Sequence, residues 1–483
     1  MIEKSLKTLF LIEICEGFAF YGIGAILTLF MVQFLNLNLS FALLIYGVYS
    51  GLVYISTLLG GHLCDKYIGS RSLINVGSIT MMVGLLLLSY GASLNHPLTP
   101  LHSSFLFNTP EIILIISLIC VIIGAGFLRV SISSIVSALY QKDENELESN
   151  FTFLNMALNI GAVSASLILG LTIGEGNPLL YKYGFLILAS SLIIGIIIYN
   201  LFRNKYLINE NGEKVGTKPL IKTITKFNEA KDKINETTDK IKESTNKIKE
   251  NTDKIKLTKI EKNHIKFILI IEVISLIFFI GFEVLDSTLM FFAKDYVLSS
   301  ITYLPFKVTP EMIKFIEPLG VIIFSPIIIG YFASKKEDYN LVSKIIMGII
   351  VLLISYIIFF VLAIMADNGV TNISIVFIII MELIRSLSEI LVLPIILSIV
   401  SKYAPKQYLS RLMGLFYCFL AGAYTLSGFM ASFFPDKNNM IIPKLFGIIP
   451  VADFKTFSLI FIVMYLVLLL VTFVSKNKIK SLI

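Results

Sequence analysis

Ionisable side chains lie inside long apolar segments of this sequence, at spacings that place several of them on shared helix faces. Glu13 and Glu16 are three residues apart, as are Glu283 and Asp286, so each pair shares one face of a helix. A charge at the centre of a bilayer costs about 3 kcal/mol on insertion scales, so each such residue needs a partner or a function. Carboxyl groups without a partner there are suited to taking up protons.

Other apolar segments carry the same kind of residue. Glu382, Arg385 and Glu389 fall at positions i, i+3 and i+7 of one predicted helix, and therefore on one face. The remaining members of the set are Glu272, Glu317 and Arg129. Because the set holds eight acids and two bases, ion pairs that fix helix packing can account for only some of the acids. We expect others to line a proton or solute pathway.

The segments that carry these residues are long enough to cross a membrane. Of the 483 residues, 56% are hydrophobic and 15% are charged, against about 45–50% and 25% in soluble domains. About 20 apolar residues in a helix span a hydrocarbon core of about 30 Å. We therefore predict an all-α polytopic membrane protein with twelve transmembrane helices, at residues 8–34, 41–63, 72–93, 111–139, 151–173, 181–202, 265–292, 311–333, 342–365, 371–401, 410–434 and 455–475.

A polar connector divides these helices into six and six. The predicted parts are an N-terminal six-helix bundle over 1–202, a charged, partly helical cytoplasmic linker over 203–264, and a C-terminal six-helix bundle over 265–483. An isoleucine recurs every seven residues in the linker, at Ile234, Ile241, Ile248 and Ile255. One apolar residue per heptad is too few for a stable coiled coil. The linker is therefore expected either to lie along the membrane surface or to bind a regulatory partner.

The positions of Lys and Arg predict the orientation in the membrane. With a cytoplasmic N-terminus, the inside segments hold more of these residues than the outside loops. The outside lysines are then Lys182, Lys294, Lys307, Lys314, Lys437, Lys444 and Lys455. Both termini are predicted to be cytoplasmic. The expected location is the cytoplasmic (inner) membrane of a bacterial cell, with a eukaryotic plasma membrane as the alternative. The first span is too long for a signal sequence and is expected to be retained. The net charge of +7 follows from this topology and does not indicate nucleic-acid binding.

Several other classes of protein find no support. The four cysteines lie in apolar segments without a CxxC spacing, and the four histidines form no ligand cluster. No phosphate loop of the form GxxxxGKS/T is present, which disfavours an ATP-driven pump. We expect no enzymatic activity, no metal and no cofactor.

Seven short motifs are spread over most of the chain. They are EICEGFAFYG (13–22), GGHLCDKYIGSR (60–71), GAGFLRVSISSIVSALY (124–140), FTFLNMALNIGA (151–162), FEVLDSTL (282–289), EPLGVIIFSP (317–326) and SEILVLPIILSIVSKYAP (388–405). In this order they resemble the signatures of the proton-dependent oligopeptide transporter (POT) family, a branch of the major facilitator superfamily. The resemblance implies the major facilitator fold, in which two six-helix bundles rock about a site at the membrane midplane.

The resemblance also implies roles for individual residues. Glu13 and Glu16 match two glutamates of proton coupling, and Glu283 matches an acid of the extracellular gate that also takes part in this coupling. Glu389 matches the acid that binds the amino end of a peptide. Arg129 replaces a lysine that can pair with the helix 1 glutamates or with a substrate carboxylate, and arginine keeps the charge but gives up a proton far less readily.

Two further groups complete the predicted site. We expect the substrate pocket to include Tyr21, Asn155, Asn159 and Glu317. We expect the gating residues to be Asp65, Arg71, Asp286 and Arg385, of which the first two lie in the cytoplasmic loop between helices 2 and 3.

The sequence departs from the family pattern in ways that make the predicted pocket more acidic. Gly17 and Gly24 stand where the family has cations in helix 1, and Glu317 stands where it has an asparagine. The other departures are Phe20, Val130, Ser131, Asn155 and Val284, and the chain has no tryptophan. Either the two glycines allow closer helix packing while other groups bind peptides, or the pocket prefers zwitterionic or cationic ligands.

The predicted function is that of a proton-coupled symporter. It would import di- and tripeptides or related small zwitterionic or cationic solutes by alternating access, with the proton gradient as its energy source. The expected partners are a small peptide or amino-acid-like substrate, protons and the lipid bilayer. The alternatives are an amino acid or amine transporter of the same fold, and a non-transporting membrane receptor or scaffold that kept the fold.

Overall fold

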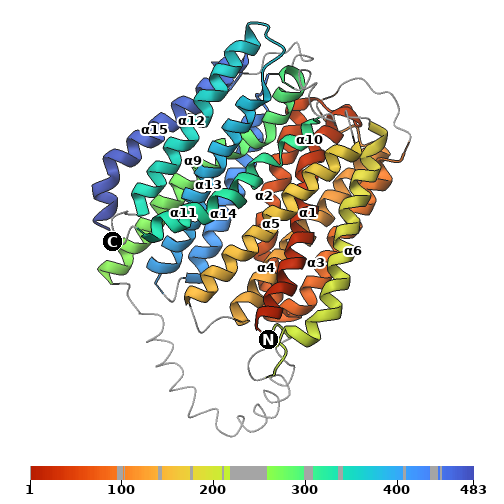
Figure 1. Cartoon of the computed structure of the whole chain (residues 1–483), viewed down its shortest axis with the longest axis vertical. Helices are drawn as coiled ribbons and strands as arrows, with labels where there is room; N and C mark the ends of the chain where they lie inside the picture. Colours follow the sequence, from red (N-terminus) through yellow and green to blue (C-terminus); the bar gives the residue numbers. More distant parts are fainter. Residues whose placement is uncertain are drawn as a thin grey trace, which may run out of the picture.

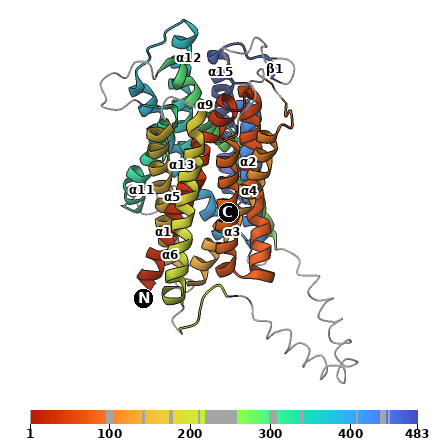
Figure 2. The same ribbon diagram turned by 90° about the vertical axis from the view of Figure 1, so that its right-hand side faces the viewer.

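Long helices run side by side through the whole molecule (Figures 1 and 2). The computed structural model describes residues 2–94, 102, 104–139, 144–173, 178–208, 212–217, 258–297, 308–334, 341–405, 409–435, 444–445 and 449–482. Before the linker, the helices are α1 (Ile2–Gln33), α2 (Leu39–Leu63), α3 (Ser70–Gly91), α4 (Thr109–Leu139), α5 (Glu144–Ile173) and α6 (Tyr181–Tyr206). After it come α9 (Lys259–Tyr296), α10 (Pro310–Ile313), α11 (Ile316–Ser334), α12 (Leu341–Asp367), α13 (Ile375–Tyr403), α14 (Leu409–Ala431) and α15 (Phe454–Lys480).

The remaining elements are short and lie in connections. A π-helical turn, Cys64–Ile68, joins α2 to α3, and a 3₁₀ turn, Pro178–Leu180, precedes α6. A two-residue hairpin of β1 (Lys444–Leu445) and β2 (Ile449–Pro450) precedes α15.

The helices have the length and composition of membrane spans. Among the described residues, ten helices are long and apolar enough to cross a bilayer. The helices α11 and α13, which contain Pro326 and Pro394, pack among them. Large apolar side chains point outward from several helices, as expected where a helix faces lipid; Leu171, Leu201 and Val474 are examples. This confirms the predicted all-α polytopic fold class, and these twelve long helices correspond to the twelve predicted spans.

Polar caps explain where several helices begin. The side chain of Asn38 accepts a hydrogen bond from the Phe41 backbone N–H at the start of α2, over 3.0 Å. Thr258 and Glu261 form a capping box at the start of α9. Asp453 accepts from the Thr456 N–H at the start of α15, over 2.8 Å.

The helices before the linker pack mainly on one another, as do those after it. In the first group α1 packs on α5 and α6, and α3 packs on α4 and α6. In the second group α12 packs on α13 and α15, and α9 packs on α14 and α13. The two groups contact each other mainly through α2, which packs on α14, and α5, which packs on α10 and α11. The exact domain boundaries stay a prediction; α6 extends to Tyr206 and α9 begins at Lys259, and the heptad repeat lies outside the described residues.

The two groups meet closely near one end of the bundle, which we call the distal end because it lies away from both termini (Figure 1). There α2 and α14 cross at Gly47 and Gly428, where a Cβ atom on Gly428 would lie 2.5 Å from the Gly47 Cα atom. Where α5 packs on α10, a Cβ atom on Gly170 would lie 2.4 Å from Cγ of Met312. The crossing of Gly47 with Gly428 is therefore a backbone contact that only glycine permits.

The predicted span at 311–333 is interrupted, which corrects its start. α10 ends at Ile313 and α11 begins at Ile316. Pro318 lacks the N–H that would bond to the carbonyl of residue 314, and its ring clashes with that carbonyl in a continuous helix. The break leaves Lys314 at the C-terminal cap of α10.

Candidate functional site

A buried ion pair joins α1 to α4 in the N-terminal group of helices. Nε of Arg129 donates to Oε1 of Glu16 over 2.9 Å, and the guanidinium group lies over the Phe20 ring, 3.9 Å from its centre. Nη2 of Arg129 is buried and has no hydrogen-bond partner among the residues that the structure describes. Arg129 therefore binds Glu16 through one edge and keeps a donor for another group.

Glu13 lies one helical turn before Glu16 and is also buried. The second oxygens, Oε2 of Glu13 and Oε2 of Glu16, have no donor within the described part of the chain. Two acids thus share one cation, and the structure brings together the three residues that the sequence assigned to coupling and to the substrate carboxylate.

Gly17 and Gly24 lie where side chains would collide with neighbouring helices. A Cβ atom on Gly17 would lie 2.6 Å from the carbonyl oxygen of Leu158 in α5. A Cβ atom on Gly24 would lie 3.0 Å from the hydroxyl oxygen of Tyr46 in α2. Gly17 therefore allows close helix packing against the α5 backbone, whereas at Gly24 the nearest group is the end of the Tyr46 side chain.

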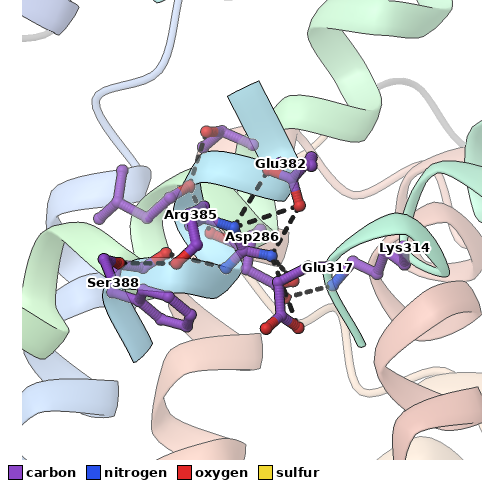
Figure 3. A network of polar contacts seen from close by, with 10 residues as sticks. Asp286, Lys314, Glu317, Glu382, Arg385 and Ser388 are labelled. Atoms are coloured by element: carbon purple, nitrogen blue, oxygen red, sulfur yellow. Dashed lines mark hydrogen bonds and ion pairs between the residues drawn. The ribbon is translucent and has the colours of Figure 1, made fainter. Parts of the chain in front are cut away.

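Arg385 is the centre of a second charged cluster, in the C-terminal group (Figure 3). Its Nη2 lies 2.8 Å from Oε2 of Glu382, and its Nε also donates to Glu382 over 3.1 and 3.2 Å. The side chains of Arg385 and Glu382 are 1% and 2% exposed. The same Nη2 reaches Asp286 at 3.2 Å and Glu317 at 4.0 Å. Arg385 thus ties α13 to α9 and α11.

Lys314 is a cation of this cluster that the sequence analysis placed in an outside loop. Its Nζ donates to Oδ2 of Asp286 over 2.7 Å and lies 5.2 Å from the centre of the Tyr46 ring in α2. The helix break before Pro318 turns Lys314 toward the interior, which its position beside an apolar segment did not reveal. Its partner Asp286 belongs to another helix, so no local spacing in the sequence indicated this pair.

Glu317 of α11 and Glu389 of α13 bring two carboxyl groups into contact. The two side chains lie within hydrogen-bonding range of each other. Oε1 of Glu317 is buried, and no hydrogen-bond donor reaches it from the described residues. Glu389 also interacts with Tyr21 of α1, across the boundary between the two groups of helices.

Two tyrosine hydroxyl groups connect Glu283 of α9 to α2. The Tyr424 side chain hydrogen-bonds with Glu283, and the Tyr54 hydroxyl donates to the Tyr424 oxygen over 3.2 Å. Glu283 is thereby linked to both groups of helices at a level just inside the glycine crossing of α2 and α14.

The structure places the other predicted residues in more varied surroundings. Tyr21 is 38% exposed. On α5, the Asn159 side chain donates to the Asn155 carbonyl over 2.9 Å. Arg71 is buried and donates to the carbonyls of Arg203 and Leu207, which ties α3 to the end of α6. The side chain of Asp65 lies outside the described part of the chain.

Glu272 of α9 is fully buried, and neither oxygen receives a hydrogen bond from the described residues. It lies in the membrane-spanning length of α9, not at its end.

Within the described residues there is no group of three or more His, Cys, Asp or Glu side chains that could hold a metal ion.

Long apolar helices in two packed groups, with buried ion pairs inside each group, define the architecture of a multi-pass membrane transporter. A model described as the POT family matches residues 71–448. The chain belongs to the POT family, as its seven motifs indicated. The family and the similar proteins are transporters and not enzymes.

Relatives and solved structures cover nearly the whole chain. The chain is 27% identical to the uncharacterized transporter YclF of Bacillus subtilis (strain 168), over 99% of this chain and 95% of that protein. It is 24% identical to dipeptide and tripeptide permease B of Salmonella typhimurium, over 90% and 88%. A crystal structure of a peptide transporter POT in complex with alafosfalin is 22% identical, with a TM-score of 0.76 and 99% and 96% coverage. A POT family transporter in complex with 5-aminolevulinic acid is 20% identical, with a TM-score of 0.77 and 99% and 96% coverage. These structures share the fold.

Proposed function

We propose that this protein imports di- and tripeptides, or closely related small zwitterions, together with protons. The observation that carries the proposal is the Glu16–Arg129 pair, in which a buried acid and a peptide carboxylate compete for one cation. When a substrate carboxylate takes Arg129, Glu16 loses its partner and binds a proton, because an unpaired charge is unfavourable in a low dielectric. Substrate and proton are then carried in the same half-cycle.

The second end of the substrate has an acid to bind. Glu389 acts electrostatically on Tyr21 of the opposite group of helices, so a peptide that spans the boundary meets Arg129 at its carboxylate and Glu389 at its ammonium. This arrangement supports zwitterionic substrates. The dipeptide and tripeptide permeases among the relatives support the same class, and they disfavour a receptor or scaffold that has lost transport.

We infer alternating access with the distal end facing outward. The Lys and Arg distribution supports cytoplasmic termini in the inner membrane of a bacterium, and the distal end is then the closed extracellular side. Protons that enter from outside reach Glu283 first and then the Glu13 and Glu16 region. Neutral acids release their partner cations, and the two groups of helices can then rock apart at this end.

The test is uptake of the dipeptide Ala-Ala by the purified full-length protein in proteoliposomes. We expect a pH gradient, acidic outside, to accelerate uptake and to raise the accumulated level above that of vesicles without a gradient. Uptake of 5-aminolevulinic acid, measured in parallel, tests an amino-acid-like solute. Equal uptake rates with and without the gradient would defeat the coupling, and uptake of the amino acid alone would favour the alternative substrate class.

A further inference from the structure

The contact between Glu317 and Glu389 has an unusual balance of donors and acceptors. An ionised carboxylate can only accept hydrogen bonds. Two ionised carboxylates within hydrogen-bonding range repel each other and leave their facing oxygens without a donor. The buried Oε1 of Glu317 has none in the described part of the chain. A proton held between the two groups supplies the missing donor.

The neighbouring cations are already engaged. Arg385 is 4.0 Å from Glu317, but its Nη2 is 2.8 Å from Glu382 and 3.2 Å from Asp286. Its Nη1 faces the Phe282 carbonyl at 3.4 Å. Lys314 is held by Asp286 at 2.7 Å. Two cations thus face Glu283, Asp286, Glu317, Glu382 and Glu389, so full ionisation of the acids would leave an excess of negative charge.

The pair also lies where a ligand can reach it. Glu389 is half-buried, and the groups that act on it come from several helices. They are Glu317 of α11, Arg385 of its own helix, Glu283 and Asp286 of α9, and Tyr21 of α1. Tyr21 belongs to the opposite group of helices and is partly exposed. A ligand between the two groups would therefore meet Glu389 first and Glu317 behind it.

We propose that Glu317 and Glu389 form one amine-binding site that holds a shared proton when empty and exchanges it for the ammonium group of a ligand. An ammonium group carries donors for both carboxylates, so it takes over the role of the proton. The proton leaves to water, and the net charge of the pair with its occupant stays at minus one. The ammonium identity of the ligand rests on the proposed function; the shared proton does not.

The exchange sets the substrate class and a pH dependence. A free amine is required, because an acylated nitrogen carries no charge to replace the proton. Ligand and proton compete, so acidification weakens amine binding at this pair, by up to about tenfold per pH unit for a one-for-one exchange. This effect opposes the gain that protonation brings at the Glu16–Arg129 pair.

The shared proton can be tested without any ligand. Infrared spectra of the full-length protein at about pH 7 report the C=O stretch of protonated carboxyl groups, and the difference between wild type and a variant isolates the band of the changed group. We expect this band to be smaller in Glu317→Gln than in wild type, because glutamine donates to Glu389 and allows it to ionise. Glu389→Gln should lose the same intensity and serves as the second variant. Glu261→Gln, at the capping box of α9 where glutamine fills the same role, should leave the band unchanged. Equal bands in wild type and both pair variants would overturn the shared proton.

The exchange is tested by calorimetry in two buffers of different ionisation enthalpy. The proton released by the pair offsets the proton that Glu16 takes up, so wild type should show little net proton exchange for each Ala-Ala bound. Without release from the pair, Glu317→Gln should show net uptake that is higher by up to about one proton. Acetyl-Ala-Ala, which has no ammonium group, should give the same net uptake in both proteins. The same net proton exchange with Ala-Ala in wild type and Glu317→Gln would overturn the exchange. If wild type binds no Ala-Ala, the proposed peptide transport fails, whereas the infrared comparison still decides the shared proton.

Discussion

Arg129 holds Glu16 through its Nε, at 2.9 Å, while its Nη2 is buried without a partner among the described residues. The pair therefore uses only part of the guanidinium fork, and the remaining edge suits a carboxylate oxygen. On this geometry we propose that Arg129 is both the partner of a proton-binding acid and the anchor for a substrate.

Replacing Arg129 with alanine should abolish uptake of Ala-Ala. The substitution removes the proposed substrate anchor. It also leaves Glu16 buried without its cation, and breaking a buried pair in this way costs about 3–5 kcal/mol of stability. Uptake and counterflow in proteoliposomes should both fall. Lys402→Ala, which removes an exposed cation of α13, is the control and should keep uptake. Undiminished counterflow in Arg129→Ala would contradict the assignment.

Glu16→Gln should separate exchange from accumulation. Glutamine resembles the protonated acid, so it cannot bind and release a proton in each cycle. We expect counterflow of Ala-Ala to persist within a fewfold of wild type, while the pH gradient no longer raises the accumulated level. Asp295→Asn, an exposed acid of α9, should retain both activities. Gradient-driven accumulation in Glu16→Gln would show that coupling does not pass through this residue.

The sequence predicted what depends on local pattern. The apolar segments marked the spans because bilayer thickness dictates helix length, and the spacing of Glu382 and Arg385 placed them on one face, where the structure pairs them. The pairing of Lys314 with Asp286 depends on a helix break and on tertiary packing. Lys314 was therefore assigned to a loop.

The glycine contacts were beyond sequence reasoning for a related reason. Gly47 meets Gly428, and Gly17 meets Leu158, from helices far apart in the chain. A single glycine in an apolar segment does not reveal which helix approaches it. The sequence left open whether Gly17 serves packing or specificity, and the crossing of α1 and α5 shows its packing role.

Asp453→Ala should destabilise the protein in a pH-dependent way. Burial alone would raise the pKa of Asp453, but hydrogen bonds from Thr456 and the nearby Lys455 outweigh it and lower this pKa. A lowered pKa adds stability above the unfolded value of about 3.9, and that stability is lost as the pH falls through the folded value. Loss of the cap should cost about 1 kcal/mol near neutral pH and less in acid.

The measurement is the apparent melting temperature of the purified protein as a function of pH. Asn38→Ala removes a neutral cap, that of α2, so its cost should not change with pH over the same range. Parallel pH profiles for the two variants would show that the charge of Asp453 contributes nothing.

Gly17→Ala should destabilise the crossing of α1 and α5. Its Cβ atom would lie 2.6 Å from the Leu158 carbonyl oxygen and 2.9 Å from the Leu158 Cα atom. These are backbone atoms and cannot rotate away, so overpacking should cost about 1–3 kcal/mol and lower the apparent melting temperature. Gly330→Ala is the matched control, since nothing lies within 4 Å of its Cβ position. There alanine should be neutral or stabilise the helix by up to about 1 kcal/mol. Equal melting temperatures for the two variants would contradict the packing role of Gly17.

Gly428→Ala should oppose closure of the distal end. Its Cβ atom would lie 2.5 Å from the Gly47 Cα atom and 2.9 Å from the Leu43 carbonyl oxygen, so α2 and α14 could not approach as closely. A cost of about 1–3 kcal/mol on the closed state alone shifts the equilibrium toward the open state by about fivefold to a hundredfold. A single cysteine at Ser50, which is buried here, in a background without the native cysteines, reports this shift. Its labelling by a membrane-impermeant maleimide from the distal side should accelerate in Gly428→Ala.

Gly414→Ala lies on the same helix, and its Cβ would meet only Leu58 at an ordinary 3.6 Å, so its labelling rate should match wild type. If Gly428→Ala labels no faster than Gly414→Ala, the glycine crossing does not control closure.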